Sequence, residues 1–185
     1  MRILLILFVA LLLFSCSGCR HSTTGVEGKM ANTIVITSTA FKEGEMIPVQ
    51  YTCDGKSMSP PLAWSNVPAH TVTCALIVDD PDAPMGTFVH WVLFNIPGTT
   101  THLAEHMPAE NTYPDGAVSG INSARKTGYT PPCPPSGTHR YYFKLYALDT
   151  KLELKPGSSK EDLEKAMEGH ILAQGQLMGR YQRKK

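Results

Sequence analysis

The fold is decided by the stretch Val72-Thr73-Cys74-Ala75-Leu76-Ile77-Val78, which runs directly into the carboxylates Asp79 and Asp80. None of its residues is charged, and the β-branched Val, Thr and Ile side chains favour a strand over a helix. Its apolar residues do not alternate with polar ones, so both faces of the strand must be covered. The stretch therefore predicts a buried central strand.

Two further runs predict core strands of the same sheet system. Phe88-Val89-His90-Trp91-Val92-Leu93-Phe94-Asn95 is apolar on both faces, and His139 to Leu148 alternates apolar and polar residues over its later half. Other strands are expected over Thr33 to Ser38, over Met46 to Tyr51 with an edge-type proline at position 48, and, as a short last strand, over Gln176 to Tyr181. The chain is therefore expected to be mainly β.

One helix is expected near the C-terminus. Ser158 and Ser159, followed by Glu161 and Asp162, match a capping box, in which side chains and backbone amides at a helix start bond reciprocally. Residues at helical spacing follow: Leu163, Ala166, Met167, His170 and Ile171. Gly169 and Gly175 are expected to end or bend this helix.

Long connections rich in Pro and Gly separate these elements: Cys53 to Pro61, Asp79 to Gly86, Ile96 to Asn122 and Gly128 to Gly137. Connections longer than about 12 to 15 residues are usually functional or disordered. The segment from Ile96 to Asn122 exceeds that length. We find no internal repeat, and we expect a single domain over residues 33–185.

Composition excludes several classes of protein. Of 185 residues, 42% are hydrophobic and 18% are charged, which is typical of a globular domain and unlike disordered, collagen-like or coiled-coil chains. With 17 Lys and Arg against 16 Asp and Glu, the chain has no basic excess of the kind that neutralises the phosphates of nucleic acids. We therefore expect no nucleic-acid partner.

The N-terminus has the pattern of a targeting segment. Ile3 to Phe14 contains no polar side chain and is too short to span about 30 Å of hydrocarbon as a helix. Leu13-Phe14-Ser15-Cys16 resembles the lipobox of bacterial lipoproteins, so residues 1–15 are expected to be a signal peptide and Cys16 the acylated residue. The alternatives are acylation of Cys19 and a plain secretory signal.

Residues 16–32, rich in Ser, Thr and Gly, are then expected to be a flexible tether between membrane and domain. The protein is accordingly expected at the bacterial cell envelope, held by its lipid anchor at the outer membrane or the periplasmic face.

Three further cysteines can oxidise in such a compartment. Cys74 lies in the apolar central stretch and is expected to be a small buried hydrophobe, which leaves Cys53 and Cys133 as the candidate pair. Free thiols at both positions are the alternative.

Residues that can carry chemistry follow or open the predicted core strands. Asp79-Asp80-Pro81-Asp82-Ala83-Pro84 places three carboxylates in a turn that the prolines hold stiff. It either aims a carboxylate at a histidine or a ligand, or forms an Asx turn that caps backbone amides. His90 lies among apolar residues, and His139 follows a proline-rich loop that resembles a preformed rim.

Such a set can bind a divalent metal, do acid–base work, or hold a small anion through histidine N–H groups, and spacing alone does not decide among these. The HExxH, GxSxG and GxxxxGK[ST] signatures are missing from the sequence. Ser136 and Cys133 lie near His139, but closeness in a loop does not make a nucleophile and a base. We therefore expect no enzyme, no metal and no cofactor.

Several segments, in chain order, resemble the phosphatidylethanolamine-binding protein (PEBP) family, in its bacterial and archaeal Raf-kinase-inhibitor-like branch. They are Asp80-Pro81-Asp82-Ala83-Pro84, then Val89-His90-Trp91 leading into Asn95-Ile96-Pro97, and Pro132-Cys133-Pro134-Pro135 leading through Gly137 into His139-Arg140-Tyr141. Earlier and later segments also match: Tyr51 to Gly55, Ser59 to Trp64, Asn122-Ser123 and Gly169 to Ala173.

The resemblance implies a PEBP-like β fold with a large central antiparallel sheet, a smaller second sheet and a peripheral C-terminal helix. It also implies a small cavity in which family members hold phosphate, phosphorylethanolamine-like groups, acetate or cacodylate. Carried over to this chain, the ligand-binding residues are Asp80, Asp82, Pro84, His90, Pro132, His139 and Tyr141. Thr130 and Pro131 stand where members commonly have glycines, which predicts a narrower or weaker pocket.

The expected function is non-enzymatic binding of a small anion or a phospholipid head group at the envelope. The alternative, implied by eukaryotic relatives that inhibit kinases or proteases, is a protein-binding regulator acting through surface loops such as Ile96 to Asn122. The resemblance also makes a homodimer a candidate oligomeric state, because related bacterial proteins often form one.

Overall fold

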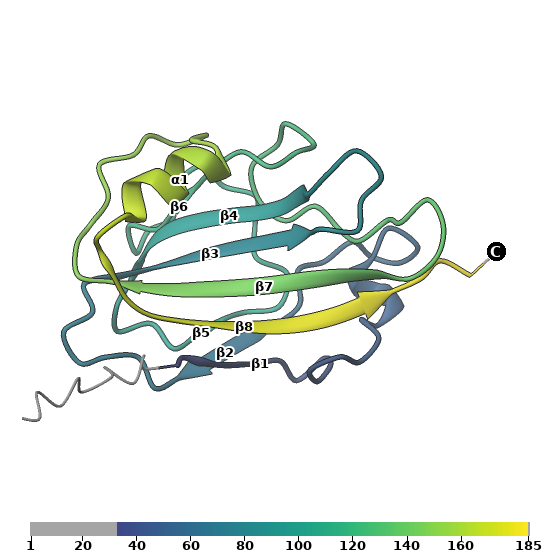
Figure 1. The fold of residues 1–185 in the computed structure, drawn as a ribbon, viewed down its shortest axis with the longest axis horizontal. Coiled ribbons are helices and arrows are strands. Elements are labelled where there is room, and N and C mark those ends of the chain that lie inside the picture. Colours follow the sequence, from purple (N-terminus) through teal and green to yellow (C-terminus); the bar gives the residue numbers. More distant parts are fainter. Residues whose placement is uncertain (1–32, 185) are drawn as a thin grey trace, which may run out of the picture.

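The computed structural model describes residues 33–184, which form a mainly β fold with one α-helix (Figure 1). Its elements are β1 (Val35–Thr37), the 3-10 helix η1 (Val49–Tyr51), β2 (Leu62–Ser65), β3 (Thr73–Asp80), β4 (Phe88–Pro97), β5 (His102–Leu103), β6 (Val118–Ser119), β7 (His139–Leu148), α1 (Lys160–Met167) and β8 (Ile171–Tyr181). The signal peptide, Cys16 and the tether expected from the sequence lie outside the described residues.

The strands form two sheets. The larger one is antiparallel and has the order β6-β4-β3-β7-β8, and the smaller one has the order β1-β2-β5. In Figure 1 the small sheet lies below the large one and α1 lies above it. The expected fold, a large antiparallel sheet with a smaller second sheet and a peripheral C-terminal helix, is confirmed.

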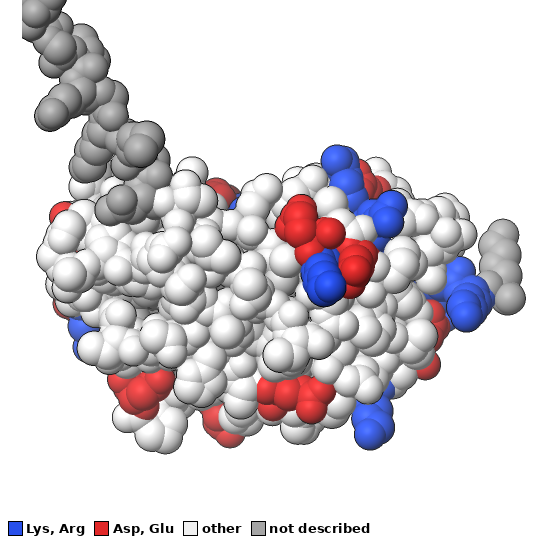
Figure 2. All heavy atoms as spheres, turned by 90° about the horizontal axis from the view of Figure 1, so that it is seen from below, with Lys and Arg blue, Asp and Glu red and all other residues white. Residues whose placement is uncertain are grey.

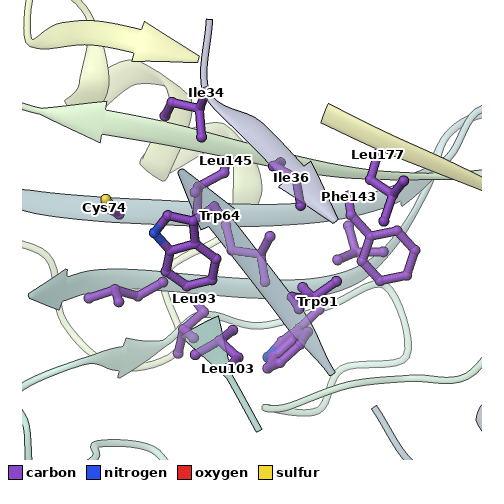
Figure 3. Close-up of a cluster of buried hydrophobic side chains, with 14 of the residues drawn as sticks. Ile34, Ile36, Trp64, Cys74, Trp91, Leu93, Leu103, Phe143, Leu145 and Leu177 are labelled. Carbon is purple, nitrogen blue, oxygen red and sulfur yellow. The ribbon is translucent and has the colours of Figure 1, made fainter. Parts of the chain in front are cut away.

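The central stretch is confirmed as the most buried strand, since every residue of β3 is buried. Its two faces belong to different cores. Leu76 and Val78 pack between the sheets in a cluster that includes Trp64, Trp91 and Phe143 (Figure 3). Ala75 and Ile77 face α1 with other apolar residues, among them Val92, Phe94, Leu163 and Met167. A strand covered on both sides needs this unbroken apolar run.

The helix begins as expected. The Ser159 side chain accepts the backbone N–H of Asp162, and the Asp162 carboxylate accepts the N–H of Ser159, which completes the capping box. The helix ends at Met167, and Gly169 follows with φ +79°, a left-handed conformation that glycine adopts readily. His170 and Ile171 therefore lie beyond the helix, although their spacing matched it.

The last strand is longer than expected, because β8 covers Ile171–Tyr181 and contains Gly175. The carbonyl of Ile34 approaches Gly175 so closely that a β-carbon at this position would meet it. The glycine therefore permits the backbone before β1 to lie against β8, and it does not mark a bend of the helix.

The expectation of a strand over Met46 to Tyr51 is wrong, since Val49–Tyr51 forms η1. Ile47 donates its N–H to Arg180 of β8, but Pro48 has no N–H with which to continue a ladder. The Tyr51 and Thr52 amides instead donate to the Pro48 and Val49 carbonyls, which closes the short helix.

Within residues 33–184 there is no helix that is long and apolar enough to cross a membrane.

Candidate ligand pocket

The polar candidates converge at one end of the large sheet, where β3 ends and where β4 and β7 begin. A cavity of about 180 Å³ opens there. It is lined by Asp80, Ala83, Pro84, Phe88, His90, Thr130, Pro131, Cys133, Pro134, Pro135, His139 and Tyr141. Five of the seven residues expected to bind a ligand are therefore in its wall: Asp80, Pro84, His90, His139 and Tyr141.

Asp80 orients His139. Its Oδ2 lies 2.7 Å from Nδ1 of the imidazole, and both side chains are buried. Its Oδ1 accepts the backbone N–H of Asp82 at 2.8 Å. Because a carboxylate only accepts hydrogen bonds, Nδ1 of His139 carries the proton, and Nε2 is the nitrogen left for a ligand.

His90 is held in the same tautomer by a different partner. Its Nδ1 donates to the carbonyl oxygen of Thr130 at 2.7 Å, which again leaves Nε2 as the other ring nitrogen. Burial lowers the pKa of His90, and the hydrogen bond to Thr130 and the charge of Asp80 offset only part of this effect. His90 is therefore neutral at pH 7, with a lone pair on Nε2.

A β-bulge gives His90 its direction. Val78 of β3 pairs with Trp91, but the next residue, Asp79, pairs with Val89, so His90 is an extra residue of β4. Trp91 faces the core between the sheets and Val89 faces α1. The bulge lets His90 turn toward the pocket, where its ring contacts the Tyr141 ring edge-on with centroids 5.2 Å apart.

Tyr141 provides a buried hydrogen-bond donor. Its side chain is 1% exposed, and its hydroxyl has no hydrogen-bond partner among the described residues. Burial raises the pKa of this phenol, and the charge of the Asp80 carboxylate and a marginal contact with it, outside hydrogen-bond geometry, raise the pKa further, so the hydroxyl keeps its proton. A buried O–H without a well-formed hydrogen bond to the protein is costly, so this hydroxyl is suited to donate to an acceptor on a ligand.

Asp82 lies outside the cavity wall, because Arg140 holds it. Its carboxylate accepts from Nε and Nη2 of Arg140 at 2.9 and 2.7 Å and from the Arg140 backbone N–H at 2.9 Å. The guanidinium lowers the pKa of Asp82 to about 2. This two-pronged contact ties the turn after β3 to the start of β7, so Asp82 positions the wall without lining it.

Pro132 also lies outside the wall. It is buried, and its carbonyl accepts the N–H of Cys53 at 3.0 Å. The next residue, Cys133, forms the expected disulfide with Cys53, with Cα atoms 5.4 Å apart, and Cys74 is free and buried as predicted. The disulfide fastens the rim loop to the segment after η1.

Several wall residues were missed by sequence reasoning. Phe88 lies two residues before His90, a spacing that in a strand places two side chains on one face, and this signal could have found it. The sequence singled out Thr130 only as a residue that stands where family members commonly have a glycine, but its carbonyl is what orients His90. Pro131 lines the cavity as well, and the expectation of a narrower or weaker pocket than in other family members stays a prediction.

The arrangement is suited to binding. Two imidazole Nε2 atoms and one phenol hydroxyl remain for a small polar ligand, behind a rim of prolines that cannot flex freely. Among residues 33–184, no group of three or more His, Cys, Asp or Glu side chains could hold a metal ion.

A two-sheet β fold with a small pocket at one sheet end, lined by prolines, aromatic rings and a few polar groups, suits the class of proteins that bind small ligands. Residues 37–182 match the family model described as phosphatidylethanolamine-binding protein, and the chain belongs to this family.

Relatives from distant organisms agree with this assignment. The chain is 54% identical to a UPF0098 protein of Methanothermobacter thermautotrophicus over 144 residues, which is 78% of this chain and 95% of the relative. It is 43% identical to a UPF0098 protein of Pyrococcus horikoshii over 188 residues, which is 100% of this chain and 91% of the relative.

Two solved structures are similar as well. A phosphatidylethanolamine-binding protein homologue from Chlamydia trachomatis is 43% identical with a TM-score of 0.76, covering 83% of this chain and 100% of its own. Escherichia coli YbcL, described as a member of the mammalian PEBP family, is 34% identical with a TM-score of 0.76, covering 82% and 99%.

Proposed function

We propose that this protein is a non-enzymatic binding protein for a small oxyanion, either a free phosphorylated solute or the phosphate of a lipid head group. The observation that carries the proposal is the buried Tyr141 hydroxyl, which lines the cavity and has no hydrogen-bond partner among the described residues. An anionic oxygen would accept from this hydroxyl, and the two histidines lie in the same wall.

A binding role without turnover is supported by what happens to the candidate nucleophiles. The sulfur of Cys133 is bound to Cys53, so it is not a thiolate. Ser136 does not line the cavity that holds His139. His139 is therefore left without the nucleophile that acyl transfer would need.

The test is calorimetric titration with inorganic phosphate and with phosphorylethanolamine. Tyr141→Phe removes one hydroxyl, and its affinity should fall about tenfold, because a hydrogen bond to a charged oxygen contributes about 1.5 kcal/mol or more. The matched control is Tyr146→Phe. Tyr146 is a half-buried residue of β7 that packs with the apolar residues facing α1. Absence of saturable binding to the unsubstituted protein would refute the proposal.

Vesicles distinguish the two sources of the phosphate. A head-group binder should bind phosphatidylethanolamine vesicles, and phosphorylethanolamine should compete for the site. A solute binder should bind the soluble compound and ignore the vesicles.

We further propose that the protein is anchored at the bacterial envelope through Cys16, the residue that the lipobox-like pattern predicts to be acylated. In Figure 1 the described chain begins at the end of the large sheet opposite to the C-terminus, and the pocket lies at the C-terminal end of β8. An anchor that joins the domain at its N-terminal end therefore leaves the pocket end free to face the aqueous phase. Mass spectrometry of the Cys16→Ser and Cys19→Ser variants from a bacterial membrane fraction tests this. The protein should lack acyl chains only when Cys16 is substituted.

A second candidate function, binding of a protein partner, is favoured by Met85. This residue is fully exposed in the turn that also supplies Pro84 to the cavity wall. A fully exposed apolar side chain beside a ligand pocket suits a contact surface for a protein partner. A Met85→Lys variant that loses self-association or partner binding but keeps phosphate binding would support this candidate.

The face in Figure 2 carries intermixed acidic and basic side chains, which provides no continuous basic path for a nucleic acid.

A further inference from the structure

The charge of the pocket wall is unusual for an oxyanion site. Among the described residues that line the cavity there is no lysine and no arginine, and the one carboxylate is Asp80. Arg140 is close in sequence, but its guanidinium is engaged by Asp82 outside the wall. The wall therefore places the Asp80 carboxylate beside the ligand position and supplies no lysine or arginine from residues 33–184 to offset it, which disfavours an anion in a poorly solvated site.

The hydrogen-bonding pattern adds to this problem. Both Nδ1 atoms are used, by Asp80 in the case of His139 and by the Thr130 carbonyl in the case of His90. A neutral imidazole bound in this way offers only an acceptor at Nε2. The Tyr141 hydroxyl is then the one polar donor among these three side chains. An anion that can only accept hydrogen bonds would face two lone pairs.

We propose, on the basis of the proposed oxyanion function, that the pocket binds its ligand together with a proton, and that it selects oxyacid monoanions that still carry an O–H group. The ligand O–H donates to an Nε2 of the histidine pair, and one of its other oxygens accepts from Tyr141. An anion without an O–H binds only when a histidine takes up a proton from solution, which turns Nε2 into a donor and neutralises the charge of Asp80.

The groups that face the two imidazoles determine how readily this uptake occurs. Burial opposes protonation of His90 most; the Thr130 carbonyl, the charge of Asp80 and, from the other face of the sheet, the charge of Asp79 favour it, and His139 from β7 opposes it. Around His139 they are Asp80 in direct contact, Asp82 with its Arg140 partner, and the neutral Tyr181, which lies opposite it in β8. Tyr181 donates its hydroxyl to Asp54, and Arg183 balances that carboxylate.

A matched pair of probes tests the proposal. Methyl phosphate, as its monoanion, and methyl sulfate have the same charge and nearly the same shape, but only methyl phosphate has an O–H. At pH 6 methyl phosphate should bind at least tenfold more tightly. Its affinity should fall toward tenfold per pH unit above pH ~6, where phosphate monoesters lose their second proton.

Methyl sulfate should show the complementary behaviour. Its affinity should rise as the pH falls from 8 to 5, with uptake of about one proton, measured as a dependence of the binding enthalpy on the ionisation enthalpy of the buffer. His90→Gln and His139→Gln should reduce this proton uptake, whereas His102→Gln, an exposed residue of β5, should leave it unchanged.

The outcomes separate this proposal from the proposed function. Equal affinity for the two probes, or methyl phosphate affinity that is constant between pH 6 and pH 8, overturns the proton-coupled selection and leaves oxyanion binding intact. Failure of both probes and of phosphate to bind at any pH overturns the proposed function itself. Tighter binding of methyl phosphate with the stated pH dependence supports both.

Discussion

Asp79 and Asp80 are neighbours at the end of β3, yet they face opposite sides of the sheet and have opposite surroundings. Asp79 is buried on the α1 side, where one of its oxygens accepts from Lys144 and from Lys160, each at 2.9 Å. Asp80 is buried on the pocket side, where its side-chain partner is the imidazole of His139.

The two sides show how one sheet can separate stability from binding. On the α1 side, Lys160 is the first residue of the helix, so its contact with Asp79 fastens α1 to β3. On the pocket side, no lysine or arginine of the described chain lines the cavity wall, and the Cys53–Cys133 disulfide holds the rim loop to the segment after η1. Asp79 is thus paired with two lysine ammonium groups, whereas the side-chain partner of Asp80 is a single imidazole.

Removal of the disulfide should have the largest effect. The Cys53→Ala/Cys133→Ala double variant opens a loop with a sequence separation of 80, and the free energy of unfolding should fall by about 4 kcal/mol. Urea denaturation measures this. Phosphate affinity should fall as well, because Cys133 is part of the wall. Full stability and full phosphate affinity of the double variant would contradict the view that the disulfide holds the pocket rim in place.

Asp79→Ala should separate the two sides most clearly. It removes the shared partner of Lys144 and Lys160 and should lower the free energy of unfolding by about 3 kcal/mol, near the lower limit for breaking a buried ion pair because both lysines retain some exposure. Phosphate affinity of the folded protein should stay within about twofold. Loss of binding at retained stability would show that the two carboxylates are not independent.

Ser159→Ala tests the α1 side with a smaller change. The variant loses the side-chain acceptor for the Asp162 N–H, and chemical denaturation should show a loss of about 1 kcal/mol. Ser158→Ala is a partial control, since that hydroxyl bonds to the Lys155 carbonyl outside the helix. Equal effects of the two substitutions would argue against the cap.

Acid should affect the pocket side in two steps. The folded-state pKa of His90 is lowered, so the unfolded chain binds more protons below pH ~6.5 and stability falls as the pH drops through that range. The pKa of Asp82 is lowered from 3.8 to about 2, so its contribution is present above pH 4 and is lost between pH 4 and pH 2.

The Asp82 step should amount to about 1 kcal/mol or less, because the pair with Arg140 is partly exposed to solvent. Unfolding measured across pH in Arg140→Gln should lack this second step and keep the first. Persistence of both steps in that variant would assign the second step to other carboxylates.

Much of the fold followed from local patterns. The apolar runs of β3 and β4, the alternation of β7, the capping box at Ser159 and the pairing of Cys53 with Cys133 were all predicted. Two predictions were wrong: Val49–Tyr51 forms η1 and not a strand, and β8 is longer than expected. In both cases, backbone that precedes residue 48 lies against β8. Sequence periodicity does not record which distant segment covers an edge.

The site was predicted less completely, for a similar reason. Asp80, His90, His139 and Tyr141 have the residue types that bind small ligands, but Asp82 was expected in the wall and lies against Arg140 instead. Its role depends on the partner that β7 brings to it, 58 residues away in the sequence.

The sequence by itself determined the long core strands and the buried core, because these depend on hydrophobic periodicity, and its resemblance to a known family implied most of the polar residues of the pocket. Only the tertiary structure decided the direction of the His90 side chain. Strand alternation alone would place it on the face opposite to Trp91, and the bulge in the pairing with β3 returns it to the pocket side. Only the tertiary structure decided, too, that lysines pair with Asp79 and a histidine accompanies Asp80. Those partners lie 59 to 81 residues away and are brought together by sheet pairing and helix packing.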